Sequence, residues 1–216
     1  MLKDSVSVAG FIKEVKPIRM KEPLAELLGA FEAFGCDEFE YRFEDLIKVA
    51  GHVCPTVSMA YLLCRYGLRE LYNDKVPVRG DVSVLMPGKP DEGVLGVIGQ
   101  VLSFITGASM DTGFKGISGH HKRKNLLRYS GKSEKGIQRF IFKRLSAEKQ
   151  IEIIVFPHLL PTLSQSQEMR IVELLEKNVW DGASSDEVLE FRKLWLQKVK
   201  NIIMEDKNIN RWLIIN

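Results

Sequence analysis

The residues best suited to chemistry lie together in one short turn, Gly51-His52-Val53-Cys54-Pro55. Proline favours the first position of a helix, so Cys54 is expected just before a helix N-terminus, where free backbone N–H groups and the helix dipole stabilise a thiolate. A thiolate attacks electrophiles and binds metal ions, and His52 can add an imidazole ligand or base. We therefore treat Cys54 as the candidate catalytic nucleophile and both residues as candidate metal ligands. The alternative interpretation is that Cys54 is a small buried residue and that His52 hydrogen-bonds within the turn.

The other two cysteines are poorer candidates. Cys64 lies among apolar residues later in the same predicted helix and is expected in the core, while Cys36 stands beside Asp37 and Glu38, whose charges disfavour a thiolate. Three cysteines cannot all pair within one chain, and none of them shows the close spacing of a zinc finger. We expect free thiols and a cytoplasmic location.

A glycine-rich loop over residues 107–125 is the second candidate site. It ends in Gly119-His120-His121-Lys122-Arg123-Lys124-Asn125. Neutral imidazoles bind zinc and iron, so His120 and His121 are candidate ligands. They would complete a metal site with the histidine and cysteine of the turn, and zinc is the expected transition metal. Adjacent histidines on a basic loop are also commonly exposed to solvent, and the sequence leaves both interpretations open.

The same loop supports a rival interpretation as a site for a small anionic ligand. Lys122, Arg123 and Lys124 place positive charge next to flexible backbone amides, and such groups hold phosphate or carboxylate. The loop lacks the spacing of a phosphate-binding P-loop, and a run of charges is commonly just a solvated surface. Nucleic-acid binding is not expected, because Phe114 alone gives poor stacking support and the whole chain carries a net charge of only +3.

The elements that would position these residues follow from apolar spacing, glycines and prolines. A helix from residue 43 should end at Gly51 with a positive φ, and a long buried helix should begin at Pro55. The loop 107–125 should connect a helix to a strand. The helices are expected over 23–34, 43–50, 55–72, 91–106, 166–178 and 185–204, and the strands over 6–12, 81–86, 126–129, 137–142 and 151–156, the last two as an antiparallel hairpin.

These elements predict an α+β fold in which an antiparallel sheet packs against helices. We expect a core over residues 1–160 and a helical C-terminal extension over residues 161–216. Trp180, Trp195 and Trp212 all lie in the extension, and large aromatic side chains at such positions often pack against a main domain or a partner protein.

The composition excludes several classes of protein. With 45% hydrophobic and 27% charged residues, the chain resembles ordinary globular proteins rather than disordered, collagen-like or disulfide-rich ones. No stretch approaches the roughly 18 apolar residues of a membrane span, and no apolar signal core follows the first residues, so we expect no membrane association. No serine elbow, paired-carboxylate motif or dinucleotide fingerprint is present, which argues against standard hydrolases and dehydrogenases.

The turn carries a resemblance to a known family. Gly51-His52-Val53-Cys54-Pro55 is similar to the Gly-His-x-Cys-Pro signature of the formylmethanofuran dehydrogenase E-subunit family, and the order of elements over residues 43–145 resembles that family more loosely. The resemblance implies an α+β core, a homodimer, a cysteine and histidine metal site, and a redox or accessory role, with membership of a larger redox complex as a further implication.

The chain also departs from that family. Where the family has further cysteines, this sequence has Gly93 to Gly96 and Ala108-Ser109, and the C-terminal zinc module is missing because the last third of the chain contains no cysteine. Only His52 and Cys54 therefore transfer directly from the resemblance.

The sequence thus leads to one main expectation and two alternatives. The main expectation is a metal-binding protein resembling the formylmethanofuran dehydrogenase E-subunit, with enzymatic activity left open. The first alternative is a non-enzymatic binding module that uses the basic loop 113–125 to hold an anionic ligand. The second is a component of a larger complex that docks through its tryptophan-bearing extension.

Overall fold

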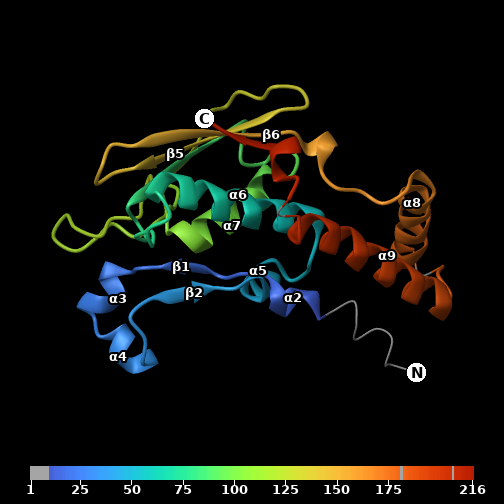
Figure 1. Cartoon of the computed structure of the whole chain (residues 1–216), viewed down its shortest axis with the longest axis horizontal. Coiled ribbons are helices and arrows are strands. Elements are labelled where there is room, and N and C mark those ends of the chain that lie inside the picture. The colour runs from blue at the N-terminus through green and yellow to red at the C-terminus, as the bar shows by residue number, and fades with distance from the viewer. Residues whose placement is uncertain (1–9, 181, 206) are drawn as a thin grey trace.

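The computed structural model describes residues 10–180, 182–205 and 207–216. Its main element is a five-stranded sheet with the strand order β4-β3-β5-β6-β7. Helices α6 and α7 lie against one face of this sheet, and a two-stranded ribbon of β1 and β2 lies on the far side of those helices (Figure 1). The elements are β1 (Ile18–Met20), β2 (Phe39–Tyr41), β3 (Val82–Met86), β4 (Leu127–Tyr129), β5 (Gln138–Arg144), β6 (Gln150–Val155), β7 (Leu213–Ile215), α2 (Phe11–Glu14), α3 (Pro23–Leu27), α4 (Ala30–Phe34), α5 (Phe43–Ala50), α6 (Pro55–Tyr72), α7 (Leu95–Thr106), α8 (Gln165–Val179), α9 (Ser185–Ile203), and the short 3-10 helices η1 (Pro157–Leu159) and η2 (Ile209–Arg211).

The predicted α+β class is confirmed, and the sheet is mixed rather than wholly antiparallel. Strands β5, β6 and β7 pair antiparallel in turn, and β3 pairs antiparallel with β5. Strands β3 and β4 pair parallel. Parallel neighbours need a long crossover connection, and α7 supplies it between these two strands. The predicted β5–β6 hairpin is confirmed.

Helix α6 is the centre of the core. As predicted, it begins at Pro55, and 13 of its 18 residues are buried because it packs between the sheet and the β1–β2 ribbon. On the ribbon side, the Tyr61 hydroxyl lies 2.8 and 2.9 Å from the carbonyl oxygens of Lys16 and Tyr41, which share its one donated proton. On the sheet side, the helix approaches so closely that a Cβ on Gly67 would lie 2.5 Å from Ile153 Cδ1.

Three expected elements differ from the structure. Residues 10–12 of the expected strand 6–12 lie in a turn and in α2, because Phe11 buries its ring in the core from one helical turn, and residues 6–9 lie outside the described part. The expected helix over 23–34 is two short helices, since Gly29 adopts a left-handed φ of 74° between them. Helix α7 begins at Leu95 rather than near residue 91, after a turn closed by the Leu95 N–H and the Glu92 carbonyl.

The C-terminal segment contains the two predicted helices and also a strand that the sequence analysis did not identify. That strand, β7, pairs antiparallel with β6, and Trp212 just before it is buried at 1% exposure. The extension expected over residues 161–216 therefore contributes an edge strand to the core sheet. Trp180, in contrast, is 79% exposed.

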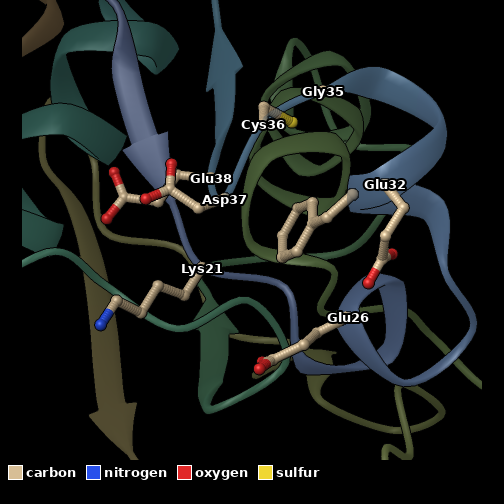
Figure 2. A pocket seen from close by; sticks show the side chains of 8 residues that line it. Lys21, Glu26, Glu32, Gly35, Cys36, Asp37 and Glu38 are labelled. Atoms are coloured by element: carbon tan, nitrogen blue, oxygen red, sulfur yellow. The ribbon is translucent and has the colours of Figure 1, made fainter.

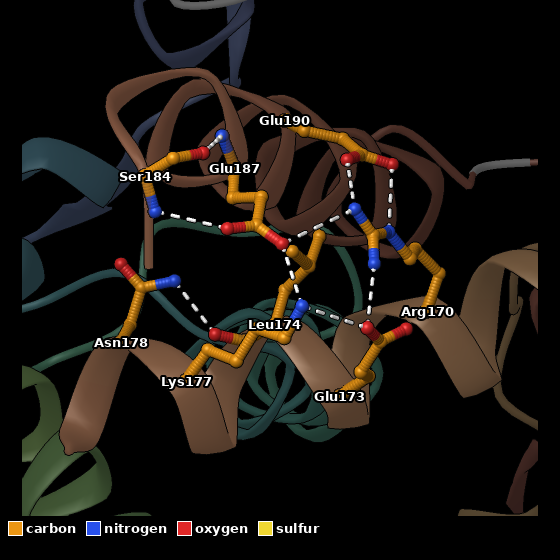
Figure 3. Close-up of polar contacts among 8 residues, drawn as sticks. All are labelled: Arg170, Glu173, Leu174, Lys177, Asn178, Ser184, Glu187 and Glu190. Atoms are coloured by element: carbon orange, nitrogen blue, oxygen red, sulfur yellow. Dashed lines mark hydrogen bonds and ion pairs between the residues drawn. The ribbon is translucent and has the colours of Figure 1, made fainter. Parts of the chain in front are cut away.

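Helices α8 and α9 form a hairpin fastened by charged side chains (Figure 3). Arg170 donates two hydrogen bonds to the Glu190 carboxylate, at 3.1 and 2.7 Å, and Lys177 contacts Glu187 at 2.6 Å. Ser184 caps the start of α9 as the predicted helix boundary requires. No helix in the described part of the chain is both long and apolar enough to cross a membrane.

The close contact at Gly67 gives a stability prediction. In an exposed helix position, Gly→Ala stabilises by roughly 1 kcal/mol, but here the added methyl group would press on the buried side chains of Ile153 and Phe142. We expect Gly67→Ala to lower the free energy of unfolding by about 1–3 kcal/mol, measured by urea denaturation. Glu70→Ala, one turn away on the exposed side of α6, serves as the control and should change it little. A Gly67→Ala variant more stable than wild type would contradict this packing.

Candidate functional site

The Gly51–Pro55 turn has the local geometry that the sequence predicts. Gly51 ends α5 with a φ of 73°, and Cys54 is the N-cap of α6, with its Sγ accepting a hydrogen bond from the Val57 N–H at 3.4 Å. Cys54 is buried at 8% exposure, whereas His52 is exposed. The His52 Nδ1 lies 2.8 Å from the Ala50 carbonyl oxygen, and because a carbonyl oxygen only accepts, this nitrogen donates the proton.

The structure does not bring His120 or His121 to this turn. Cys54 stands at the N-terminal end of α6, an 18-residue helix that is about 27 Å long. The loop that carries the histidines begins at the end of α7. There the Thr106 carbonyl accepts a hydrogen bond from the N–H of Gly80, which lies in the segment that follows the C-terminal end of α6. Figure 1 shows this loop projecting from the side of the molecule opposite the start of α6.

The described residues offer no alternative metal site in place of that set. Within the described residues, no group of three or more His, Cys, Asp and Glu side chains is placed to hold a metal ion. The rings of His120 and His121 are themselves tilted apart, with centroids 6.5 Å from each other. Of the four predicted ligands, His52 and Cys54 therefore lie together in the turn, whereas His120 and His121 lie in the loop 107–125, away from it.

The turn is instead fastened to the C-terminal helices. The Trp195 indole Nε1 on α9 donates a hydrogen bond of 2.7 Å to the carbonyl oxygen of Val53, the residue between the two candidate ligands. Phe191 stacks on Trp195 with ring centroids 5.6 Å apart. The turn therefore joins α5, α6 and α9, and its observed contacts are those of a structural junction.

The loop 107–125, which we call the basic arm, is an ordered hairpin. Its tip is a two-residue turn in which Ile117 and His120 exchange backbone hydrogen bonds of 2.9 Å, with positive φ values of 49° at Ser118 and 86° at Gly119. These values are typical of a type I′ turn. Nearer the base, the N–H groups of Arg123 and Lys124 both donate to the Phe114 carbonyl. The sequence analysis predicted a flexible loop instead. The glycines can be read from the sequence, but the backbone hydrogen bonds across the arm cannot.

Arg123 fixes the base of the arm to the core instead of facing a ligand. Its guanidinium Nη2 lies 2.5 Å from Oε1 of Glu22, whose Oε2 also accepts a hydrogen bond of 3.0 Å from Arg79 Nη1. The Arg123 and Glu22 side chains are only 8% and 6% exposed. Burial lowers the pKa of Arg123, while the Glu22 charge acts in the opposite direction. Arg123 was predicted to bind an anionic ligand, but its charge already has a buried partner.

The remaining basic residues of the arm are available to a ligand. Lys115 and Lys122 are exposed and Lys124 is half-buried, and none of the three forms an ion pair with a described residue. The backbone N–H groups of Ser118 and Gly119 donate no hydrogen bond to backbone within the described part of the chain. The arm therefore presents unpaired ammonium groups on a backbone of defined shape, an arrangement that can bind anions.

A second hollow in the structure is acidic, and the sequence analysis did not identify it. It has a volume of about 790 Å³ and is lined by Lys21, Glu26, Phe31, Glu32, Gly35, Cys36, Asp37 and Glu38. Figure 2 shows Glu26 and Glu32 well apart from Asp37 and Glu38. Glu38 is moreover paired with Arg19 at 3.1 Å. These carboxylates do not converge on one point, which agrees with the absence of a metal-binding group among the described residues.

Comparison with known proteins adds no family to this geometry: no family model matches the chain, and no curated protein matches it. The assignment of function therefore depends on the contacts described above.

The buried charge cluster at the base of the arm gives the second prediction. Glu22→Ala leaves the buried guanidinium of Arg123 without its partner, so we expect a loss of about 3–5 kcal/mol in the free energy of unfolding, measured by urea denaturation. Glu22→Leu combined with Arg123→Met removes the two buried charges and leaves only Arg79, whose side chain is 25% exposed, so it should recover most of that loss. Glu134→Ala, which breaks only a surface pair with Arg139, is the control and should have little effect. A loss in Glu22→Ala no larger than in the control would show that the cluster does not anchor the arm.

Proposed function

We propose that this chain is a non-enzymatic binding module that holds a small anionic ligand on the basic arm. The observation that carries the proposal is the contrast within the arm: Arg123 is engaged in an internal ion pair, while Lys115, Lys122 and Lys124 have no acidic partner in the described structure. A lysine ammonium group is a compact point charge that binds phosphate and carboxylate groups.

The anchoring of the arm supports a binding role. When a ligand must order a flexible loop, the entropy lost by the loop reduces the binding affinity. A hairpin that its own hydrogen bonds already hold avoids that cost. The arm has such bonds at its tip and near its base, and the Arg123–Glu22 pair ties it to the core. The lysine side chains therefore extend from a backbone that its own hydrogen bonds hold as a hairpin.

The resemblance to the formylmethanofuran dehydrogenase E-subunit leads to a different proposal, which the geometry supports less. A structural zinc site needs four ligands and a catalytic one needs three from the protein. The turn supplies His52 and Cys54, and the Sγ of Cys54 is engaged as the N-cap of α6. A transition-metal site at this turn, and with it a redox or accessory role, stays a prediction.

Neutralising the arm tests the proposed function. We expect Lys115→Gln, Lys122→Gln and Lys124→Gln together to weaken citrate binding by about tenfold or more, a loss of roughly 1.4 kcal/mol, in calorimetric titrations at low salt. Binding by the wild type should weaken as sodium chloride is raised, because salt screens exposed charges.

The control is a second triple variant, Lys89→Gln, Lys135→Gln and Lys193→Gln, which removes the same charge from exposed positions on other elements. It should bind citrate like the wild type. Unchanged citrate affinity in the arm variant, or an equal loss in both variants, would refute an anion site on the arm.

We further propose that two copies of the chain associate through α8. One side of this helix packs on α9, but the other side exposes an apolar stripe: Met169, Val172, Leu175, Val179 and, at its end, Trp180. Their exposed fractions are 68, 66, 42, 64 and 79%. Val172, Leu175 and Val179 follow the three-then-four spacing of a helix that packs on another helix.

The size of the stripe supports a second copy as the occupant. Apolar patches of this kind on a monomer commonly mark an interaction surface. A stable interface buries roughly 800 Å² on each partner, and five large side chains at these exposures supply much of that area. An antiparallel contact of α8 with its own copy would make the stripe self-complementary, as a two-fold interface requires.

A charge placed in the stripe tests this association. We expect the wild type to sediment as a dimer at micromolar concentration, and Val172→Glu with Val179→Glu to sediment as a monomer of unchanged circular dichroism, since a buried unpaired carboxylate opposes the contact. Leu145→Glu, an exposed apolar position in the β5–β6 turn, is the control and should leave the dimer intact. A wild-type monomer at these concentrations would exclude the interface.

A further inference from the structure

A hollow of about 730 Å³ opens beside the second half of α6, and its walls carry an excess of basic side chains. Its charged lining consists of Lys16, Arg19, Arg65, Arg69, Asp74 and Lys75. These residues come from four places: the segment before β1, β1 itself, α6, and the segment after α6. We call this site the basic hollow. It shares no residue with the basic arm.

The acidic groups near the basic hollow in the described part of the chain do not pair with all of its cations. Asp74 lies 3.7 Å from Arg69, but both side chains are largely exposed, at 81% and 59%, so this pair contributes little in water. Arg19 is paired with Glu38, which stands outside the lining. When these two pairs are set aside, Lys16 and Lys75 still have no ion pair with any described residue.

Two of the three guanidinium groups of the basic hollow lie over an aromatic ring. Arg65 and Arg69 both lie over the ring of Tyr66, with Cζ to centroid distances of 5.0 and 4.8 Å. Tyr66 itself is 7% exposed and therefore held by its neighbours. A guanidinium stacked on a buried ring is held in one orientation, and for Arg69, whose printed ion pair is through Nε, this directs the terminal N–H groups so that they can donate to an anion in pairs.

The turn that ends α6 completes the site. Asn73 and Asp74 have left-handed φ values of 51° and 60°, and the Asp74 N–H bonds back to the Arg69 carbonyl at 3.0 Å. This reversal brings Lys75 back toward the arginines of the last turns of α6, where it joins them in the lining. The rest of the wall is partly apolar and includes Pro17 and Val76.

We propose that the basic hollow binds a small molecule that carries two or more linked phosphate groups. Arginine forks donate in pairs to phosphate oxygens, and several cations around one hollow match several adjacent negative charges. The volume lies within the range of small-molecule sites, and the apolar part of the wall leaves room for an organic portion. The inference goes beyond the proposed function of the arm and does not depend on it.

The first test titrates inorganic tripolyphosphate and, separately, adenosine triphosphate into the full chain by calorimetry. The expected result is saturable binding in the wild type, with the basic hollow as the tighter site for linked phosphates. The triple variant Lys16→Gln, Arg69→Gln and Lys75→Gln should bind at least about tenfold more weakly, which corresponds to roughly 1.4 kcal/mol. Tighter binding of adenosine triphosphate than of tripolyphosphate would identify an organic phosphate as the ligand, and equal binding would identify the phosphate chain alone.

Matched variants separate the basic hollow from the arm and from surface charge in general. The arm variant Lys115→Gln, Lys122→Gln and Lys124→Gln and the control Lys89→Gln, Lys135→Gln and Lys193→Gln should both retain wild-type affinity for tripolyphosphate. Arg69→Lys alone should weaken binding because it keeps the charge but removes the fork. Thermal unfolding of each variant checks that the fold is intact. Absence of saturable binding in the wild type, or an equal loss in the control variant, overturns the proposal, and a loss only in the arm variant assigns the phosphate site to the arm instead.

Discussion

The Glu22 carboxylate, shared by two guanidinium groups in the interior, is the interaction on which the arrangement of this molecule most depends. It joins the segment after β1, the segment before β3 and the base of the basic arm, which are far apart in the sequence. Arg79 adds hydrogen bonds of 3.1 and 3.2 Å to the carbonyl oxygens of Phe104 and Ile105 at the end of α7. A buried ion pair contributes little net stability compared with an apolar replacement, but removal of one partner is strongly destabilising. The main effect of the cluster is therefore to determine which segments of the chain contact each other, and its net contribution to the free energy of folding is small.

The sequence predicted what local signals encode. Pro55 and Gly51 marked the ends of two helices, apolar spacing marked α6, and the polar turn between β5 and β6 marked a hairpin, and all of these are confirmed. The features that it missed depend on contacts between distant residues. Strand β7 has only three residues and becomes a strand because β6 offers a free edge, while Arg123 looks like part of a charge run until Glu22 is placed beside it. The same reason explains the candidate sites: the lysines of the arm could be named from the sequence, but a hollow whose charged lining comes from four separate places in the chain could not.

The turn that first suggested chemistry illustrates how one pattern supports two interpretations. A cysteine before a helix is placed well for a thiolate, and it is also placed well to cap that helix, which is what the Sγ of Cys54 does. The hydrogen bond from Trp195 to the Val53 carbonyl adds a tie to α9 that only the fold reveals. Chemistry at a metal or a nucleophile needs several groups that converge, whereas binding of an anion needs charges that no internal partner satisfies. In this molecule the described structure offers the second condition at the basic arm.

Strand β7 has a consequence for the order in which the protein can assemble as it is made. Synthesis proceeds from the N-terminus, and early segments of a chain begin to fold before later ones exist. The outer edge of β6 pairs with residues 213–215, so that edge has no partner until those residues have been translated. An open strand edge is a template for pairing with another chain. During synthesis the growing chain therefore passes through a period in which the edge of β6 is exposed. Pairing of residues 213–215 covers that edge and leaves the three-residue strand β7 as the edge of the sheet.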